Sequence, residues 1–243
     1  MTDAPFPRPF LWREPLWRRA VAEVVGTFAL VAIGCGAAAV NAATAEATGA
    51  GAVTHPGVAL AFGLVVFCVI ETVGPICGAH LNPAVTVAFA LDRRLAWRDV
   101  PVYLPAQCLG ATAAAYCLLA LLGDPAHAGV TRPNAAIGIT QIGALLVEAA
   151  LTCGLMTTVL AVATGPKEKG LLAGLSIGGV VAIEAMAFGP VTGASMNPAR
   201  SLGPAVAAAE FGDLWLYLVG PTVGAAAAVP LYRLIRPAAV AGS

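Results

Sequence analysis

Two asparagines, Asn82 and Asn197, occupy the same place in a phrase that the chain spells twice, GPICGAHLNPA and GPVTGASMNPA. Asn followed by Pro is typical of a helix start, because the Asn side chain caps free backbone N–H groups and Pro fits the first helical turn. The glycines before each Asn allow the backbone to run extended and to pack closely against its neighbours. We therefore expect two short helices, each beginning directly after one of these asparagines.

The phrase supplies hydrogen-bonding groups of two kinds. The N-terminus of a helix carries about half a positive charge, and the NH₂ group of each Asn offers donors beside it. The extended backbone before each Asn offers a ladder of carbonyl acceptors, which we expect at Gly78, Ala79, His80, Gly193, Ala194 and Ser195. Such groups suit uncharged hydroxylic molecules, whereas two positive helix ends and the nearby Arg200 would repel cations.

The composition places these motifs in a membrane. Hydrophobic residues make up 59% of the chain and charged residues 11%, with a mean hydropathy of +0.84, far from the values of soluble domains. Net charge is zero and no basic cluster alternates with aromatic residues, so we expect no nucleic-acid partner. The six cysteines show no metal-ligand spacing, and no Ser-His-Asp set or phosphate loop is visible. We expect no enzyme, no cofactor and no metal site.

Six apolar stretches are long enough to cross a bilayer, which takes about 20 residues. They are approximately Ala20–Ala43, Gly57–Gly74, Val102–Leu122, Ile137–Ala163, Leu171–Phe188 and Leu214–Ile235. Two further runs, Pro83–Leu91 and Pro198–Ala208, follow the repeated phrase and reach only about half-way at 1.5 Å per residue. The predicted fold is an all-α membrane protein with six transmembrane helices and two re-entrant half-helices. Irregular backbone at membrane depth must be buried in protein or line a wet cavity, so the phrase predicts a pore.

Basic residues set the orientation. If the six spans alternate, eleven of the thirteen lie on one side, which places both termini in the cytoplasm. Each repeat then has three crossings, so the second repeat is inverted relative to the first. We expect a cytoplasmic tail at residues 1–17, a channel domain at 18–236 and a short tail at 237–243. Repeat one covers about 18–122 and repeat two about 137–236.

Four acids lie inside the predicted spans. Glu23 and Glu148 come early in the first span of each repeat, where a hydrogen-bonded acid marks a functional or bracing site; the alternative is that both lie near the membrane interface. Glu71 and Glu184 lie in the second and fifth spans. We interpret them as acids bonded to the backbone or to a neighbouring helix. A proton or cation site, as in an ion-coupled secondary transporter, is the alternative.

The sequence also resembles a known family. LNPAVT at Leu81–Thr86 and MNPARS at Met196–Ser201, with the motifs Asn82-Pro83-Ala84 and Asn197-Pro198-Ala199, look like the paired signatures of the aquaporin or major intrinsic protein family. GASMNPARSLGPA and WLYLVGP are similar to nodulin-26-like channels and their bacterial relatives. The resemblance implies a homotetramer in the lipid bilayer, with one pore in each subunit.

The resemblance further implies a selectivity filter at Phe62, Ala185, Ala194 and Arg200. Strict water channels usually carry His where this chain has Ala185, and glycerol facilitators carry Asp where it has Ser201. We therefore expect a passive channel for water and small uncharged solutes that excludes protons and ions, the solutes being glycerol, urea or neutral metalloid hydroxides such as arsenous acid. A water-only channel is the alternative within the family. The excess of Arg over Lys and the many alanines favour a bacterial inner membrane.

Overall fold

The computed structural model describes residues 14–124, 129–163 and 167–236, so residues 1–13 and 237–243 of the predicted tails lie outside it. In order along the chain the elements are α1 Leu16–Thr48, α2 Thr54–Cys77, α3 Pro83–Leu91, η1 Trp97–Asp99, α4 Val100–Leu122, η3 Ala135–Ile137, α5 Gln141–Val162, α6 Lys167–Thr192, α7 Pro198–Ala208 and α8 Leu214–Ile235. Every regular element within the described ranges is helical. The predicted all-α fold is confirmed.

Six of the described helices are long and apolar enough to cross a membrane. The first is longer than the predicted span, because α1 runs on through Ala-rich sequence until Gly49 takes a left-handed φ of 79°. The predicted start of the fourth span at Ile137 is wrong. Gly138, with φ 75°, ends the short helix η3, and the side chain of Thr140 then caps α5 by accepting from Gly143 N.

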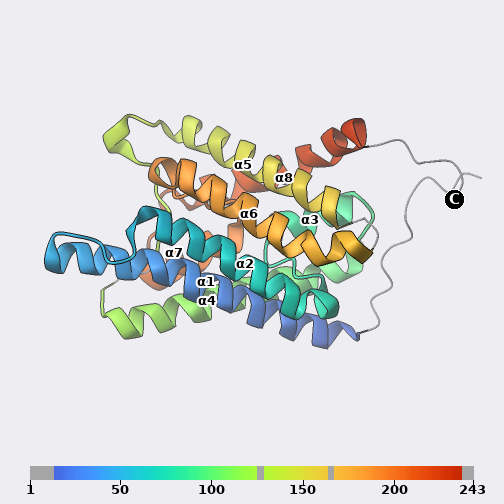
Figure 1. Ribbon diagram of the computed structural model, residues 1–243, viewed down its shortest axis with the longest axis horizontal. Coiled ribbons are helices and arrows are strands. Elements are labelled where there is room, and N and C mark those ends of the chain that lie inside the picture. Colours follow the sequence, from blue (N-terminus) through green and yellow to red (C-terminus); the bar gives the residue numbers. More distant parts are fainter. Residues whose placement is uncertain (1–13, 125–128, 164–166, 237–243) are drawn as a thin grey trace, which may run out of the picture.

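The two half-helices have the predicted bounds. Helix α3 has 9 residues and α7 has 11, so each reaches about 14 to 17 Å, half the thickness of the hydrocarbon core. They occupy opposite ends of the bundle: α3 lies toward the end where α8 finishes, and α7 lies toward the other end (Figure 1). The two repeats therefore contribute their half-helices from opposite faces, as the inverted arrangement requires.

Small residues bring the long helices close together, as is common in membranes. Helices α2 and α6 cross at Gly63 and Gly178, where a Cβ on either glycine would strike the carbonyl oxygen of the other. Gly110 of α4 packs on the backbone of α1 at Val24, and Gly224 of α8 packs on α5 at Ala149. These contacts fix the six spans around the two half-helices.

Candidate functional site

Asn82 and Asn197 each cap the half-helix that follows them. Asn82 Oδ1 accepts a hydrogen bond from Ala84 N at 2.9 Å. Asn197 Oδ1 accepts from Ala199 N at 3.0 Å and from Arg200 N at 3.3 Å. Both asparagines have extended backbone, with φ of −154° and −150°, which is the usual N-cap conformation.

The same two side chains also join the repeats. Asn82 Nδ2 donates to the carbonyl oxygen of Met196 at 2.7 Å, and Asn197 Nδ2 donates to the carbonyl oxygen of Leu81 at 2.8 Å. The half-helices therefore meet N-terminus to N-terminus. One N–H of each NH₂ group makes this cross-bond, and a second N–H remains.

The loops before the two asparagines have the same backbone conformation. In the first loop Gly78, Ala79 and Leu81 have φ of 87°, 46° and 54°. In the second loop the corresponding values are 85° at Gly193, 40° at Ala194 and 54° at Met196. A non-glycine residue in this left-handed region costs about 1–3 kcal/mol and persists only where the surroundings hold it.

Glu23 holds the first loop from behind. Its side chain is completely buried. Oε1 accepts from His80 N and Oε2 accepts from Leu81 N, each at 2.8 Å. Gln107 Nε2 on α4 donates to Oε2 at 2.8 Å as well. The acid thus binds two consecutive backbone amides that would otherwise be free inside the membrane.

Glu148 holds the second loop in the same way. It too is completely buried. Oε1 accepts from Ser195 N at 2.9 Å and from the hydroxyl of Thr192 at 2.7 Å, and Oε2 accepts from Met196 N at 2.8 Å. The alternative that these acids merely lie near the membrane interface does not account for their bonds to the two loops that meet at the half-helix junction. Both acids act on the loop of their own repeat.

Sequence reasoning missed the residues that complete this bracing. Tyr103 donates its hydroxyl to Cys77 O at 2.8 Å, and Tyr217 donates to Thr192 O at 2.6 Å. Gln107, which bonds Glu23, was missed as well. The two tyrosines occupy equivalent places in the last span of each repeat, so a residue-by-residue alignment of the repeats could have paired them.

A cavity of about 190 Å³ runs past the junction of the half-helices. Both asparagines line it, as do five of the six predicted carbonyl-ladder residues and all four predicted filter residues, with Ala194 belonging to both sets: Gly78, Ala79, His80, Ser195, Phe62, Ala185, Ala194 and Arg200. Gly193 does not line the cavity. It lies against Thr131, and a Cβ added to Gly193 would come within 3.0 Å of the Thr131 side chain.

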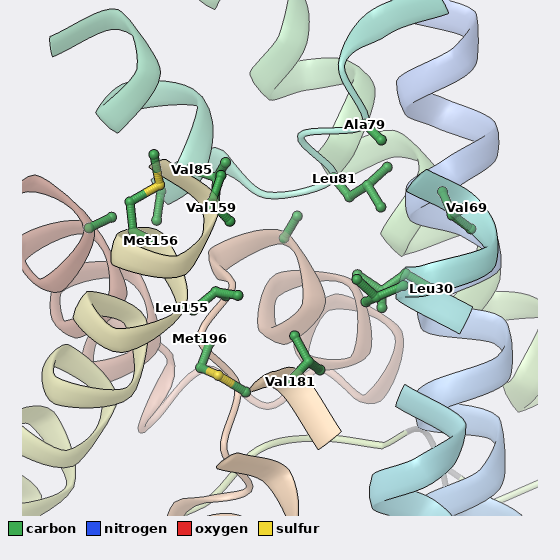
Figure 2. Packing of buried hydrophobic residues seen from close by; sticks show 14 of the residues in the cluster. Leu30, Val69, Ala79, Leu81, Val85, Leu155, Met156, Val159, Val181 and Met196 are labelled. Atoms are coloured by element: carbon green, nitrogen blue, oxygen red, sulfur yellow. The ribbon is translucent and has the colours of Figure 1, made fainter. Parts of the chain in front are cut away.

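The rest of the cavity wall is apolar. Leu30 on α1 and Leu155 on α5 come from opposite sides of the bundle, with Val181 on α6 between them (Figure 2). All three side chains line the cavity. A molecule inside it therefore meets polar groups only along the two loops, the asparagines and Arg200.

Arg200 is 4% exposed and lies in the first turn of α7. Its Nη1 donates to Gly129 O at 2.8 Å, and its Cζ lies 5.2 Å from the centre of the Phe62 ring. Its Nε is buried with no hydrogen-bond partner in the described part of the chain. Opposite this charged donor the predicted filter offers the two small side chains of Ala185 and Ala194.

The hydroxyl of Ser201 connects the second loop to the segment that holds Arg200. Ser201 Oγ lies 2.6 Å from Ser195 Oγ and accepts from Thr131 Oγ1 at 2.8 Å. Thr131 is two residues after Gly129, whose carbonyl binds Arg200. The segment from Gly129 to Thr131 is therefore tied to α7 at two points.

Glu71 and Glu184 do not line the cavity. Glu184 packs on α5, where a Cβ added to Gly154 would lie 2.7 Å from Glu184 Oε1. Glu71 is exposed on α2 and lies against Gly174 of α6. The ion-coupled transporter hypothesis relies on these two acids, and neither of them is in the wall of this cavity.

Comparisons with known proteins agree with this geometry. A family model described as Major intrinsic protein matches residues 11–232. Aquaporin NIP1-1 from Zea mays is 43% identical over 223 residues, which cover 91% of this chain and 76% of that protein. Nodulin-26 from Glycine max is 41% identical, covering 91% and 79%. The X-ray structure of the aquaglyceroporin from Plasmodium falciparum matches with a TM-score of 0.78 and 28% identity, covering 91% of this chain and 97% of that one.

Proposed function

This chain belongs to the major intrinsic protein family, and from that premise we propose that it is a passive membrane channel for water and small uncharged solutes. The observation that carries the proposal is the pair of cross-bonds between Asn82 and Asn197, made beside a cavity that both residues line. The aquaporins to which the chain is similar are channels and not enzymes.

The two loops supply the path for a hydroxylic molecule. Glu23 and Glu148 bind the loop amides, which leaves carbonyl oxygens of Gly78, Ala79, His80, Ala194 and Ser195 to accept from water or from a solute hydroxyl. The apolar wall opposite forms no hydrogen bonds. A molecule in the cavity thus replaces the hydrogen bonds that it made in bulk solvent with bonds to the carbonyl oxygens on one side. Because the other side offers no hydrogen bonds, no deep binding site holds the molecule back.

Protons are excluded at the asparagine pair. The remaining N–H of Asn82 and of Asn197 can donate to a single water oxygen at the junction. A water that accepts from both directs its own hydrogens outward, so a proton cannot hop through it along the file. The two helix N-termini, each with about half a positive charge, oppose a cation at the same place, and Arg200 adds a full charge at the filter, as in aquaporins generally.

The filter determines the solute class. Ala185 and Ala194 leave space in the filter that a His side chain would fill. Phe62 provides the filter with an apolar side, and Arg200 provides it with a side that donates hydrogen bonds. A wider filter of this kind passes glycerol, urea or neutral metalloid hydroxides as well as water. The likeness to Nodulin-26 and to an aquaglyceroporin supports this choice over a water-only channel.

The assembly is a homotetramer with a pore in each subunit and both termini in the cytoplasm, and the channel domain covers residues 18–236. The protein is an integral membrane protein. The relatives named above that come from Zea mays and Glycine max lend no support to a bacterial inner membrane, so that location rests on composition alone.

Stopped-flow light scattering on proteoliposomes tests the proposal. We expect osmotic water flux above that of protein-free liposomes, and measurable flux of glycerol, urea or arsenite down their gradients. Water flux without any solute flux would reject the widened filter and favour the water-only alternative. Solute accumulation against a gradient would instead identify a coupled transporter.

A further inference from the structure

Helix α6 has a backbone carbonyl whose usual partner is absent. In an α-helix the carbonyl of one residue accepts from the N–H four residues later. Four residues after Met186 the chain has Pro190, which lies inside α6 and has no N–H. Met186 belongs to a span, where a free carbonyl is costly unless another group binds it. The Met186 carbonyl therefore needs a donor from outside α6.

His55 supplies that donor from the start of α2. Its Nε2 lies 2.7 Å from the carbonyl oxygen of Met186. Because a carbonyl oxygen only accepts, we assign the proton to Nε2. The ring fits here because Gly189 has no side chain: a Cβ added to that glycine would lie 2.8 Å from His55 Cε1. Two neighbouring residues of α6, Gly189 and Pro190, thus make the contact with His55 possible.

The histidine bond joins α2 to α6 at a second point. The first point is the crossing at Gly63 and Gly178, where the two backbones touch. The helices lie side by side and run in opposite directions (Figure 1). His55 is eight residues before Gly63, and Met186 is eight residues after Gly178. The two contacts are therefore about 12 Å apart along each helix.

Two predicted filter residues lie between these contacts. Phe62 comes directly before Gly63 at the crossing, and Ala185 comes directly before Met186 at the histidine bond. Phe62 is also held from α1, because its ring packs closely on Gly34. Ala185 lies about 10 Å along α6 from the crossing. Its distance from Phe62 therefore depends on how firmly this end of α6 is joined to α2.

We propose that His55 is a positioning residue of the selectivity filter, which sets how far Ala185 lies from Phe62. Without the histidine bond, α6 can turn about the glycine crossing, and the displacement is larger at Ala185 than at Phe62. A filter that is free to widen admits solutes larger than water more readily, so the bond limits solute size. The inference rests on the proposed channel function and on the filter assigned above.

Variants of His55 test the inference in proteoliposomes. His55→Phe keeps a ring but has no donor, and we expect the ratio of urea flux to water flux to rise about threefold, a smaller effect on the barrier than one average hydrogen bond. His55→Gln retains an N–H donor and should keep the native ratio. Gln141→Ala is the control, because it breaks an exposed bond to Asp213 between α5 and α8, which carry no predicted filter residue.

Pro190→Ala separates the bond from the packing of the ring. The new N–H can bind the Met186 carbonyl within α6 and draw it away from His55. A role that only satisfies this carbonyl predicts a native flux ratio in Pro190→Ala. We expect instead a raised ratio without a lower unfolding temperature, and no further rise when His55→Phe is added.

Two results would overturn the inference: a native ratio in His55→Phe, or a double variant whose ratio exceeds that of either single variant. Both residues are exposed, so their replacement leaves no cavity in the core. If His55→Phe does not fold, His55→Glu takes its place, because it matches Gln in size but has no donor when ionised.

The labelling rate of a thiol at the filter separates this inference from the channel proposal. In an Ala185→Cys chain, we expect a methanethiosulfonate reagent to modify residue 185 faster when His55→Phe is added, as read by mass spectrometry of that peptide. A native chain that conducts nothing rejects the channel, while a faster rate still supports the position of His55 and an unchanged rate rejects it. A conducting chain in which His55→Phe changes neither the flux ratio nor the rate rejects the inference alone.

Discussion

Asn82 and Asn197 each donate a hydrogen bond to the carbonyl oxygen of the residue that precedes the other, at 2.7 and 2.8 Å. Each side chain also caps its own half-helix through its amide oxygen. An Asn amide can do both because it carries an acceptor and two donors. Asp could provide only the cap, and Ala could provide neither bond.

The first prediction concerns the donor function of Asn82. Asn82→Asp keeps the cap but loses the bond to Met196 O and adds a negative charge at the junction. We expect loss of about 1 kcal/mol of folding free energy for the bond, together with a cation leak that the native protein lacks. Conductance in planar bilayers measures the leak. Asn134→Asp is the matched control, because that amide binds Pro190 O outside the cavity. A non-leaking Asn82→Asp would contradict the assigned role.

The second prediction concerns the bracing acids. In the native protein both carboxylate oxygens of Glu23 accept from loop amides, one from His80 N and one from Leu81 N. In Glu23→Gln an NH₂ group replaces one of these oxygens, so one of the two amides loses its acceptor. Hydrogen bonds to charged groups contribute about 1.5–3 kcal/mol, and we expect a lower unfolding temperature and reduced water flux per protein. Glu71→Gln is the control, since Glu71 makes no hydrogen bond among the described residues and does not line the cavity. Equal effects of the two variants would show that Glu23 has no special role.

The third prediction concerns solute size. Ala185→His fills space beside Arg200, and we expect glycerol and urea flux to fall about tenfold while water flux remains, which corresponds to about 1.4 kcal/mol in the barrier. Met186→His is the control, because it introduces the same side chain at the next residue. Met186 is 41% exposed and does not line the cavity. Stopped-flow measurement of the ratio of solute to water flux decides the result. An unchanged ratio in Ala185→His would count against the filter assignment.

The fourth prediction concerns the tie between Thr131 and Ser201. Thr131→Val removes the hydroxyl at nearly constant volume, so the segment that binds Arg200 keeps one of its two anchors. We expect a loss of about 1 kcal/mol of folding free energy and weaker discrimination between water and urea, with Thr131→Ser restoring both. Thr222→Val serves as control, because that hydroxyl bonds only within its own helix, to Leu218 O. If Thr131→Val lowers stability but leaves discrimination intact, the tie is purely structural.

Local signals predicted the half-helices well. Asn-Pro determines where α3 and α7 begin, and the cap depends only on residues that are adjacent in sequence. The start of α5 was misplaced because hydropathy continues through Ile137, whereas Gly138 and Thr140 end one helix and begin the next. A hydropathy window does not register such a break.

Contacts between distant segments could not be predicted in this way. Gln107 and Tyr103 resemble any polar residue in an apolar span until packing brings them to Glu23 and Cys77. Glu71 and Glu184 have similar sequence surroundings, yet one is exposed on α2 and the other packs between α5 and α6. Which face of a helix is turned outward depends on the whole bundle.

Blocking the cavity chemically tests the central claim most directly. Ala185→Cys places a thiol in the cavity wall, and Met186→Cys places one outside it; both are treated with a methanethiosulfonate reagent in proteoliposomes, with the native chain as a further control. We predict that labelling lowers the water flux of Ala185→Cys to the level of protein-free liposomes and leaves the flux of Met186→Cys and of the native chain unchanged. Undiminished water flux through fully labelled Ala185→Cys would contradict the account, because water would then be crossing the membrane by another route.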